Sequence, residues 1–469
     1  MTNNSINLII ILFLSFIFCI SSVRAQSSIS DATTATIEAI GQDMVTLLDE
    51  VMFGERDPTT RLELLPLIEK INVALFKTPL FLESQSNIDL LENQKKELQA
   101  SFKPIVSTNG DIGQRTFEST SNGGSKTRTT GQFIKQGIEA NKTLYDFKAT
   151  DTQILSKDFE ILSIQERTKD IESDIFVEIM SSFYEVQRSL LQSRLARENL
   201  QSRKAFVNFI RERNELGASS SADVVRAESR VAGALEKLSN TLMSLSRAQA
   251  SYRQYFQEEA EPYILPKELS VEILDEFNLE NYLIEHPEII SAKLSVQSAE
   301  ANLEATISRN KGKINLNGEI SYSRSPGDTN FNQDISTGIT FSRDLYSGGA
   351  DILKIEQARI KLKSSKLEFD KVKIRISKDI RESFADYEGG VSAVDAQILV
   401  LQGAKETYSI TKELYAFSRV SLFEVLSSQE ELFNAGIKLI DSVIDRALAK
   451  YKLLNATQQL MKQITNEYS

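Results

Sequence analysis

The chain has 469 residues, of which 25% are charged and 41% are hydrophobic, and its formal net charge is −11. These totals are unlike those of a disordered chain or a polytopic helical membrane protein, and an acidic chain without a basic stripe argues against nucleic-acid binding. Only 8 prolines and 20 glycines occur, and residues 105–261 and 327–469 contain no proline. Because proline and glycine usually punctuate compact chains, this scarcity predicts very long helices and argues against an α/β enzyme, a β-sandwich or a zinc protein.

Residues 1–25 are predicted to form a signal peptide. The apolar run over residues 8–20 is about the length of a signal-peptide core and short for a membrane span, and Val-Arg-Ala at 23–25 offers a cleavage site. A retained anchor is the alternative, because no lysine or arginine precedes the run. The single cysteine, Cys19, could accept a lipid, but the bulky residues at 16–18 do not match the usual lipobox. Cleavage would leave a mature chain without cysteine, which needs no disulfide.

The remainder of the chain contains an internal duplication. At an offset of 201 residues, and of 208 residues further upstream, the matching segments include LY at 144–145 and 345–346, DVV at 223–225 and EVL at 424–426, and NGDI at 109–112 and NGEI at 317–320. Because the matches are colinear, two repeats are predicted over 61–261 and 278–464. Prolines mark a linker at 262–277, and residues 465–469 form a C-terminal tail.

Each repeat is predicted to contain a helix, two strands, a very long helix, a short turn and a second long helix. In the first repeat these elements cover about 61–102, 104–117, 132–146, 148–214 and 221–257. In the second they cover about 278–309, 313–324, 334–346, 350–416 and 422–464. On the helix at 350–416, apolar residues recur every seven positions in two stripes, at 355, 362, 369 and 376 and at 353, 360, 367 and 374. Heptads impose left-handed supercoiling, and two stripes imply a packed neighbour on each side.

The predicted strands alternate apolar and polar residues, so that each has one face of each kind. In the last strand, Ile335, Ile339 and Phe341 oppose Ser336, Thr340 and Asp344. Segments of about ten residues with this pattern suit a transmembrane β-barrel with a wet lumen. After the signal peptide no apolar run reaches about 18 residues, so a membrane crossing by the mature chain would have to use these strands. Four strands cannot close around a channel, which predicts that several copies join; a soluble four-stranded sheet on a core is the alternative.

Across about 60–464 the sequence resembles the TolC-type outer-membrane factor family. The segment LYSGGA at 345–350 is similar to the family's strand-to-helix corner, with Gly348 and Gly349 before the long helix, whereas LYDFKA at 144–149 lacks the glycines. Further similar segments are the helix openings VALFKTPL at 73–80 and LIEHPEI at 283–289 and the turns ELGASSSADVV at 215–225 and YAFSRVSLFEVL at 415–426.

This resemblance implies a mainly α-helical chain with a β-barrel portion. Three copies would each give four strands to a twelve-strand outer-membrane barrel, continued by a long periplasmic α-helical barrel. The implied partners are the other two copies, outer-membrane lipid, a periplasmic adaptor and an inner-membrane pump of the ABC or proton-driven kind, with no cofactor. Residues 26–60 are then expected to be a partly helical periplasmic extension.

The resemblance also implies a gate at the periplasmic tip of the helices. In the family a tyrosine on one hairpin bonds to an aspartate on its neighbour, an arginine assists, and acidic rings line the narrowest point. The matching positions are Tyr415 for the tyrosine, Asp223 for the aspartate, Val420 with Arg419 beside it for the arginine, and Glu424 and Ser427 for the two acidic rings. The adaptor-docking hairpins are matched by Gly217, Asp223, Ser418, Leu422 and Glu424. The alternative is that Asp223 and Glu424 cap helices, with Ser221 as a competing cap, and that Tyr415 is packing.

These features predict a passive exit duct through the outer membrane and periplasm, for small molecules or secreted protein. A periplasmic coiled-coil scaffold or adaptor without a pore is the alternative; it explains the heptads but not four amphipathic strands in the same order twice. No enzyme is predicted, because the sequence offers no nucleophile–base pair, metal cluster or phosphate-binding glycine loop. The only histidine, His286, precedes Pro287 at a helix start and is expected to be structural.

Overall fold

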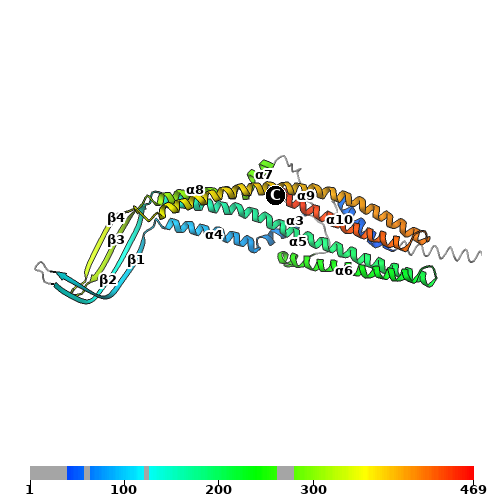
Figure 1. Cartoon of the computed structure of the whole chain (residues 1–469), viewed down its shortest axis with the longest axis horizontal. Coiled ribbons are helices and arrows are strands. Elements are labelled where there is room, and N and C mark those ends of the chain that lie inside the picture. The colour runs from blue at the N-terminus through cyan, green and yellow to red at the C-terminus, as the bar shows by residue number, and fades with distance from the viewer. Residues whose placement is uncertain (1–39, 57–63, 121–125, 261–278, 469) are drawn as a thin grey trace, which may run out of the picture. The chain divides into compact units, whose positions relative to one another are not determined.

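The computed structural model describes residues 40–56, 64–120, 126–260 and 279–468. It is mostly helical with one four-stranded antiparallel sheet, which confirms the prediction of a mainly α-helical chain that contributes four strands (Figure 1). In chain order the elements are α2 (Gln42–Arg56), α3 (Leu65–Leu75), α4 (Pro79–Ala100), β1 (Ile105–Thr120), β2 (Lys126–Tyr145), α5 (Ala149–Glu215), α6 (Ser221–Phe256), α7 (Leu279–Glu285), α8 (Pro287–Arg309), β3 (Lys313–Arg324), β4 (Asn332–Ser342), α9 (Ala350–Ala416), α10 (Leu422–Ala456) and α11 (Leu460–Tyr468). The predicted signal peptide and the whole of the predicted linker lie outside the described residues.

Three helices that were predicted as continuous are each broken into two. Pro79 begins α4 and Pro287 begins α8, because proline lacks the amide needed inside a helix and is tolerated at its first position. His286 caps α8, accepting a hydrogen bond at Nδ1 from the Glu288 amide at 3.2 Å, so its position is structural as expected. The break between α10 and α11 covers residues 457–459, where Gln458 has a φ of 57°. Because this left-handed residue is not a glycine, the break could not be predicted from the sequence.

The strands pair in the order β1–β2–β3–β4, and their register aligns the apolar residues on one face. That face carries Val106, Ile112, Ile134, Ile138, Ile314, Leu316, Ile320, Tyr322, Ile335, Ile339 and Phe341. The opposite face is polar and includes an ion pair between Lys135 and Glu319 at 3.4 Å. A bulge between Thr143 and Tyr145 places Tyr145 opposite Ile314, so Tyr145 and not Leu144, which strict alternation from Ile138 would give, continues the apolar face.

β1 and β2 are longer than predicted. The loop expected at about 118–131 is largely strand, and only residues 121–125, which the structure does not describe, separate β1 from β2. Residues 118–131 are rich in threonine and serine, and this polar composition predicts a loop. Threonine, however, also favours strands. Tertiary pairing with the neighbouring strand extends the hairpin beyond the apolar stretch that the alternation detected.

The chain divides into two compact units, and each contains parts of both repeats. One unit holds the described parts of 1–78, 173–276 and 379–469; the other holds 79–172 and the described part of 277–378, including all four strands. The repeats are therefore related by sequence but do not fold as separate bodies. Among the residues described, none of the helices is both long enough and apolar enough to cross a membrane.

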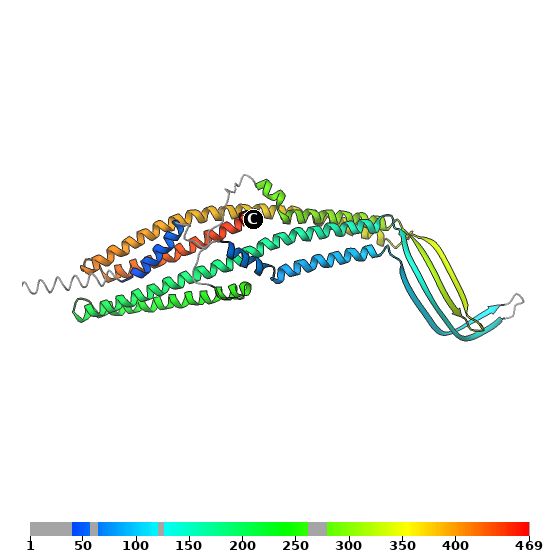
Figure 2. The same cartoon turned by 180° about the vertical axis from the view of Figure 1, so that it is seen from behind.

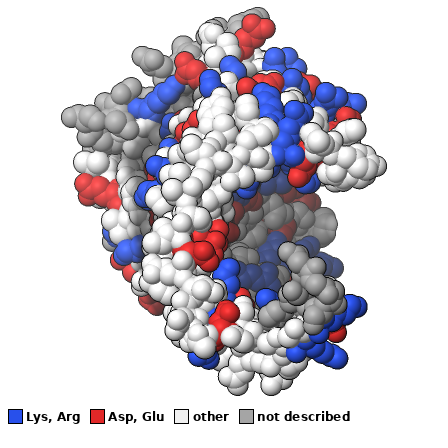
Figure 3. Space-filling model, turned by 90° about the vertical axis from the view of Figure 1, so that its left-hand side faces the viewer, with Lys and Arg blue, Asp and Glu red and all other residues white. Residues whose placement is uncertain are grey.

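Packing in the two units differs in character. In the strand-containing unit, serines let α5 approach α8 closely: Ser156 Oγ lies 3.1 Å from Ser298 Oγ, and Ser163 Oγ lies 3.0 Å from Ser291 Oγ. In the other unit, α10 has buried residues along its whole length and forms the centre of an apolar core with α2, α5 and α9. The surface carries both signs of charge, and blue lysine and arginine side chains lie beside red acidic ones on the face shown in Figure 3.

Candidate functional site

The turns between the long helices, which carry the predicted gate residues, have the same backbone geometry. Gly217 ends α5 with a φ of 73°, and Ser418, at the equivalent position of the second repeat, ends α9 with a φ of 56°. The amide after Gly217 donates to the carbonyl of Arg213 at 2.7 Å, and the amide after Ser418 donates to that of Leu414 at 2.9 Å. Both are left-handed helix terminations, in which glycine is the residue of lowest strain. The two turns therefore share the left-handed backbone at equivalent positions, although only the first has a glycine there.

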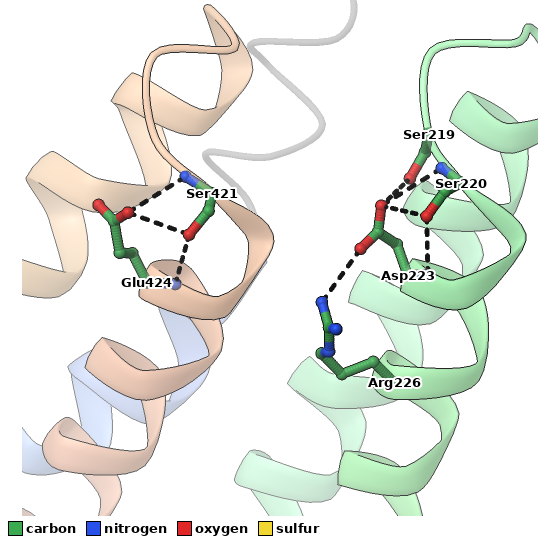
Figure 4. Close-up of polar contacts among 6 residues, drawn as sticks. All are labelled: Ser219, Ser220, Asp223, Arg226, Ser421 and Glu424. Carbon is green, nitrogen blue, oxygen red and sulfur yellow. Dashed lines mark hydrogen bonds and ion pairs between the residues drawn. The ribbon is translucent and has the colours of Figure 1, made fainter.

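Each turn is followed by a capping box at the start of the next helix (Figure 4). Ser220 Oγ accepts from the Asp223 amide at 3.1 Å, and the Asp223 carboxylate accepts from the Ser220 amide at 3.3 Å. In the second turn, Ser421 Oγ accepts from the Glu424 amide at 3.4 Å, and Glu424 accepts in return. Both carboxylates sit at the third position of their helix, so the N-cap itself is Ser220 or Ser421, and not Ser221 or Asp223.

The electrostatics of Asp223 match this role. The Ser220 side chain, the Ser220 amide and Arg226, whose Nη1 lies 3.3 Å from Asp223 Oδ1, outweigh the effect of burial and lower the pKa of Asp223. The carboxylate is therefore held in its charged form. The helix start also favours a negative charge because of the helix dipole.

Tyr415 is 7% exposed and lies in an aromatic cluster with Phe206 and Phe209, at ring distances of 6.0 and 6.5 Å. Burial raises the pKa of Tyr415, and the charge of Asp223 adds to this, while Arg213 and a side-chain hydrogen bond with Ser219 oppose it. The tyrosine of the second repeat is thus close to the aspartate of the first. Their link runs through Ser219, whose hydroxyl donates to Asp223 Oδ2 at 3.4 Å.

Arg213 joins the two turns and was not among the predicted gate residues. Its guanidinium lies 5.2 Å from the Tyr415 ring centre, and Nη2 donates to Ser418 Oγ at 3.1 Å. The predicted arginine, Arg419, is exposed. The sequence signal that could have pointed to Arg213 is its place in the last turn of α5, because cations are favoured at helix C-termini.

Apolar side chains are exposed beside both turns. Leu216 and Phe417 occupy equivalent positions of the two repeats, and Val225 and Phe423 lie in the first turn of α6 and α10. Leu422, in contrast, is buried in the core, so its place in this structure is packing. Exposed apolar residues gathered at one site commonly mark an interaction surface.

A charged network connects α5, α6 and α10, further along these helices from the turns. Arg203 is 2% exposed and donates to Glu430 Oε2 at 2.7 Å, and Lys237 also pairs with Glu430. Burial alone would raise the pKa of Glu430, but Lys237 and Arg203 outweigh it and lower the pKa. Burial lowers the pKa of Arg203. The network ties the first hairpin, α5–α6, to the second hairpin, α9–α10.

The strand-to-helix corners complete the set of predicted sites. Gly348 and Gly349 have φ values of 68° and 84°, and a Cβ at either position would have no atom within 4 Å. Phe147 and Lys148, at the equivalent positions of the first repeat, have φ values of 59° and 66°. The first corner therefore has the same left-handed backbone without glycine, at a cost in strain. Phe147 packs on Tyr145, with ring centres 5.1 Å apart.

Comparison with known proteins identifies relatives. The chain matches the model of the outer membrane efflux protein family over residues 71–256 and 278–465. It is 23% identical over 338 residues to the outer membrane efflux protein BepC of Brucella suis biovar 1 (strain 1330), covering 71% of this chain and 73% of BepC. It is 22% identical over 355 residues to the probable outer membrane lipoprotein SilC of Salmonella typhimurium, covering 72% and 75%.

Solved structures share the fold. The CusC structure has a TM-score of 0.71 at 17% identity, covering 85% of this chain and 93% of that one. The Campylobacter jejuni CmeC outer membrane channel has a TM-score of 0.71 at 13% identity, covering 86% and 89%.

Proposed function

Because this chain belongs to the outer membrane efflux protein family, we propose that it forms the outer-membrane exit duct of a tripartite efflux system. Its location is the outer membrane, and the members of its family are transport channels. The observation that carries the proposal is the two-faced sheet joined to two long helical hairpins, an arrangement shared with CusC and CmeC. The duct is passive, and a partner pump supplies the energy.

The working form is a homotrimer with a closed twelve-strand barrel. The four-stranded sheet has two open edges, at β1 and β4, and an exposed apolar face. Open sheet edges are not tolerated in lipid, because their backbone groups would have no hydrogen-bond partner. On α9, Leu353, Ile360, Leu367 and Ile374 are 59–71% exposed and repeat every seven residues. This unpartnered heptad stripe supports packing against a second copy.

The two turns dock a periplasmic adaptor. Leu216, Phe417 and Phe423 give each tip exposed apolar surface, and the turns at Gly217 and Ser418 present it. The adaptor in turn couples the duct to an inner-membrane pump of the ABC or proton-driven kind. Apolar surface with a polar rim is the usual composition of such contacts.

Tyr415, Arg213 and Ser219 form the gate together with Asp223, and Glu424 forms an acidic ring in the trimer. Three equivalent carboxylates attract cations, so trivalent cations should block the current. Glu424→Gln removes the charge but keeps the capping box, which accepts either residue. In planar bilayers this variant should need a higher trivalent cation concentration for half block. The same substitution at Glu97, an exposed residue of α4 outside both hairpins, should leave the block unchanged. Equal block of wild type and Glu424→Gln would remove Glu424 from the ring.

Deletion of the gene tests the function and its cargo. Loss of export should raise drug susceptibility if small molecules are the cargo, and should remove proteins from the secreted fraction if proteins are. No change in either readout would contradict the duct. The competing scaffold without a pore predicts a soluble periplasmic protein, so fractionation separates it from a heat-modifiable trimer in outer-membrane fractions.

A further inference from the structure

Helix α2 is built into the core of the two hairpins. It precedes the part of the chain that matches the family, which begins at residue 71. Met44, Leu47 and Leu48 are buried in the same core as α5, α9 and α10, and Leu48 is 0% exposed. In Figure 2 the blue α2 runs alongside the orange α9 and the red α10, with which it shares a core. The predicted N-terminal extension is thus a packed element over at least residues 40–49.

Polar contacts fix the start of α2 to α9. The Ile40 carbonyl accepts from the Tyr408 hydroxyl at 3.4 Å and from Lys412 Nζ at 3.2 Å. Further along, Asp49 pairs with Lys405. Tyr408 lies seven residues before Tyr415 and is buried like it, so both tyrosines belong to the inner heptad face of α9. Contacts of α2 therefore reach the same helix end that carries the proposed gate tyrosine.

Two glycines allow this close approach, one on each side. A Cβ at Gly41, whose φ is 82°, would lie 2.9 Å from the Tyr408 hydroxyl oxygen and 3.1 Å from Ser202 Oγ on α5. A Cβ at Gly436 on α10 would lie 2.6 Å from Leu48 Cδ2. Neither distance leaves room for a side chain without a shift of its neighbours. The seat for α2 is therefore shaped by residues of α5, α9 and α10 together.

We propose that residues 40–56 form a strap that holds the second hairpin against the first and must loosen before the tips separate. The strap is a positioning element for the gate, and the inference rests on the proposed channel function. Its polar contacts are to α9, and its apolar side chains share one core with α5 and α10, so an outward movement of the α9 end away from α5 pulls the strap from one side of its seat.

A disulfide between strap and seat tests this directly. The only natural cysteine is Cys19, so Leu48→Cys with Gly436→Cys introduces a single pair in the described chain. The Leu48 side chain points at position 436, so cysteines at the two positions face each other, as a disulfide requires. We expect the oxidised double variant to show a several-fold lower open probability in planar bilayers and a matching loss of drug export, both restored by dithiothreitol. The oxidised Leu48→Cys single variant is the control and should behave like wild type; Gly436→Cys alone is not a control, because its side chain would displace Leu48.

A second variant loosens the strap. Met44→Asp places a charge in the core and should raise the resting conductance several-fold, whereas Thr46→Asp, on the exposed face of α2, should not. Equal open probability of the oxidised and reduced double variant would contradict the strap, and so would a wild-type resting conductance of Met44→Asp. If the wild-type protein conducts in the same experiments, the proposed channel function is unaffected by either result. A wild type that neither conducts nor exports would instead contradict the proposed function.

Discussion

Replacing Gly217 by alanine should loosen the first turn through the backbone alone. The φ of 73° lies in the left-handed region, where a non-glycine residue costs about 1–2 kcal/mol. A Cβ at this position would have no atom within 4 Å, so a steric clash adds nothing. At a factor of ten for every 1.4 kcal/mol, the turn should open roughly 5–30 times more often. Gly233, inside α6 and equally free of neighbours, is the matched control. Gly233→Ala should stabilise its helix by about 0.5–1 kcal/mol.

Hydrogen exchange of the purified protein measures this opening. The amide of Ala218, which donates to the Arg213 carbonyl, reports on the first turn, and the amide of Arg419 reports on the second. Gly217→Ala should speed exchange at Ala218 and leave Arg419 unchanged. Unchanged exchange at Ala218, or equal acceleration at both amides, would refute the argument from backbone conformation.

Three further variants test other contacts. Lys148→Gly should relieve the left-handed strain at the first corner and stabilise the protein by about 1 kcal/mol, seen as a higher melting temperature, and a lower one would contradict it. Glu430→Leu should cost roughly 2–3 kcal/mol because buried Arg203 loses its carboxylate and keeps, among the described residues, only the hydrogen bond to Asn199. The figure is below that for a fully buried pair, since the Glu430 side chain is 28% exposed. Because the folded-state pKa of Asp223 is lowered, its capping contribution is complete above about pH 5 and is lost as the pH falls through the folded pKa. Amide protection in the first turn of α6 should fall accordingly in acid, and Asp223→Asn should abolish that dependence.

Much of the architecture could be predicted because the signals are periodic. Alternation placed β3 at 313–324 and the heptads placed α9 at 350–416, as observed. The constant offset between the repeats predicted two equivalent turns, and the structure repeats their hydrogen bonds residue for residue, from Ser220 and Asp223 to Ser421 and Glu424. Local patterns of this kind depend on neighbours in sequence, which a single chain displays.

The remaining features depend on tertiary contacts that no local pattern encodes. Arg213 reaches Ser418 across 205 positions, and Ile40 meets Tyr408 across 368. The left-handed backbone at Phe147 was hidden because the residue is not glycine, although its alignment with Gly348 was a usable signal. Function at the tips, trimer formation and cargo are properties of assemblies, and a monomer sequence constrains them only through resemblance.

The central claim is that this chain is a passive pore of the outer membrane. The most direct measurement is the current across a planar lipid bilayer after reconstitution of the trimer purified from outer-membrane fractions. We expect discrete conductance steps that trivalent cations block. A folded, trimeric preparation that carries no current, or a protein recovered only as a soluble periplasmic monomer, would contradict the claim.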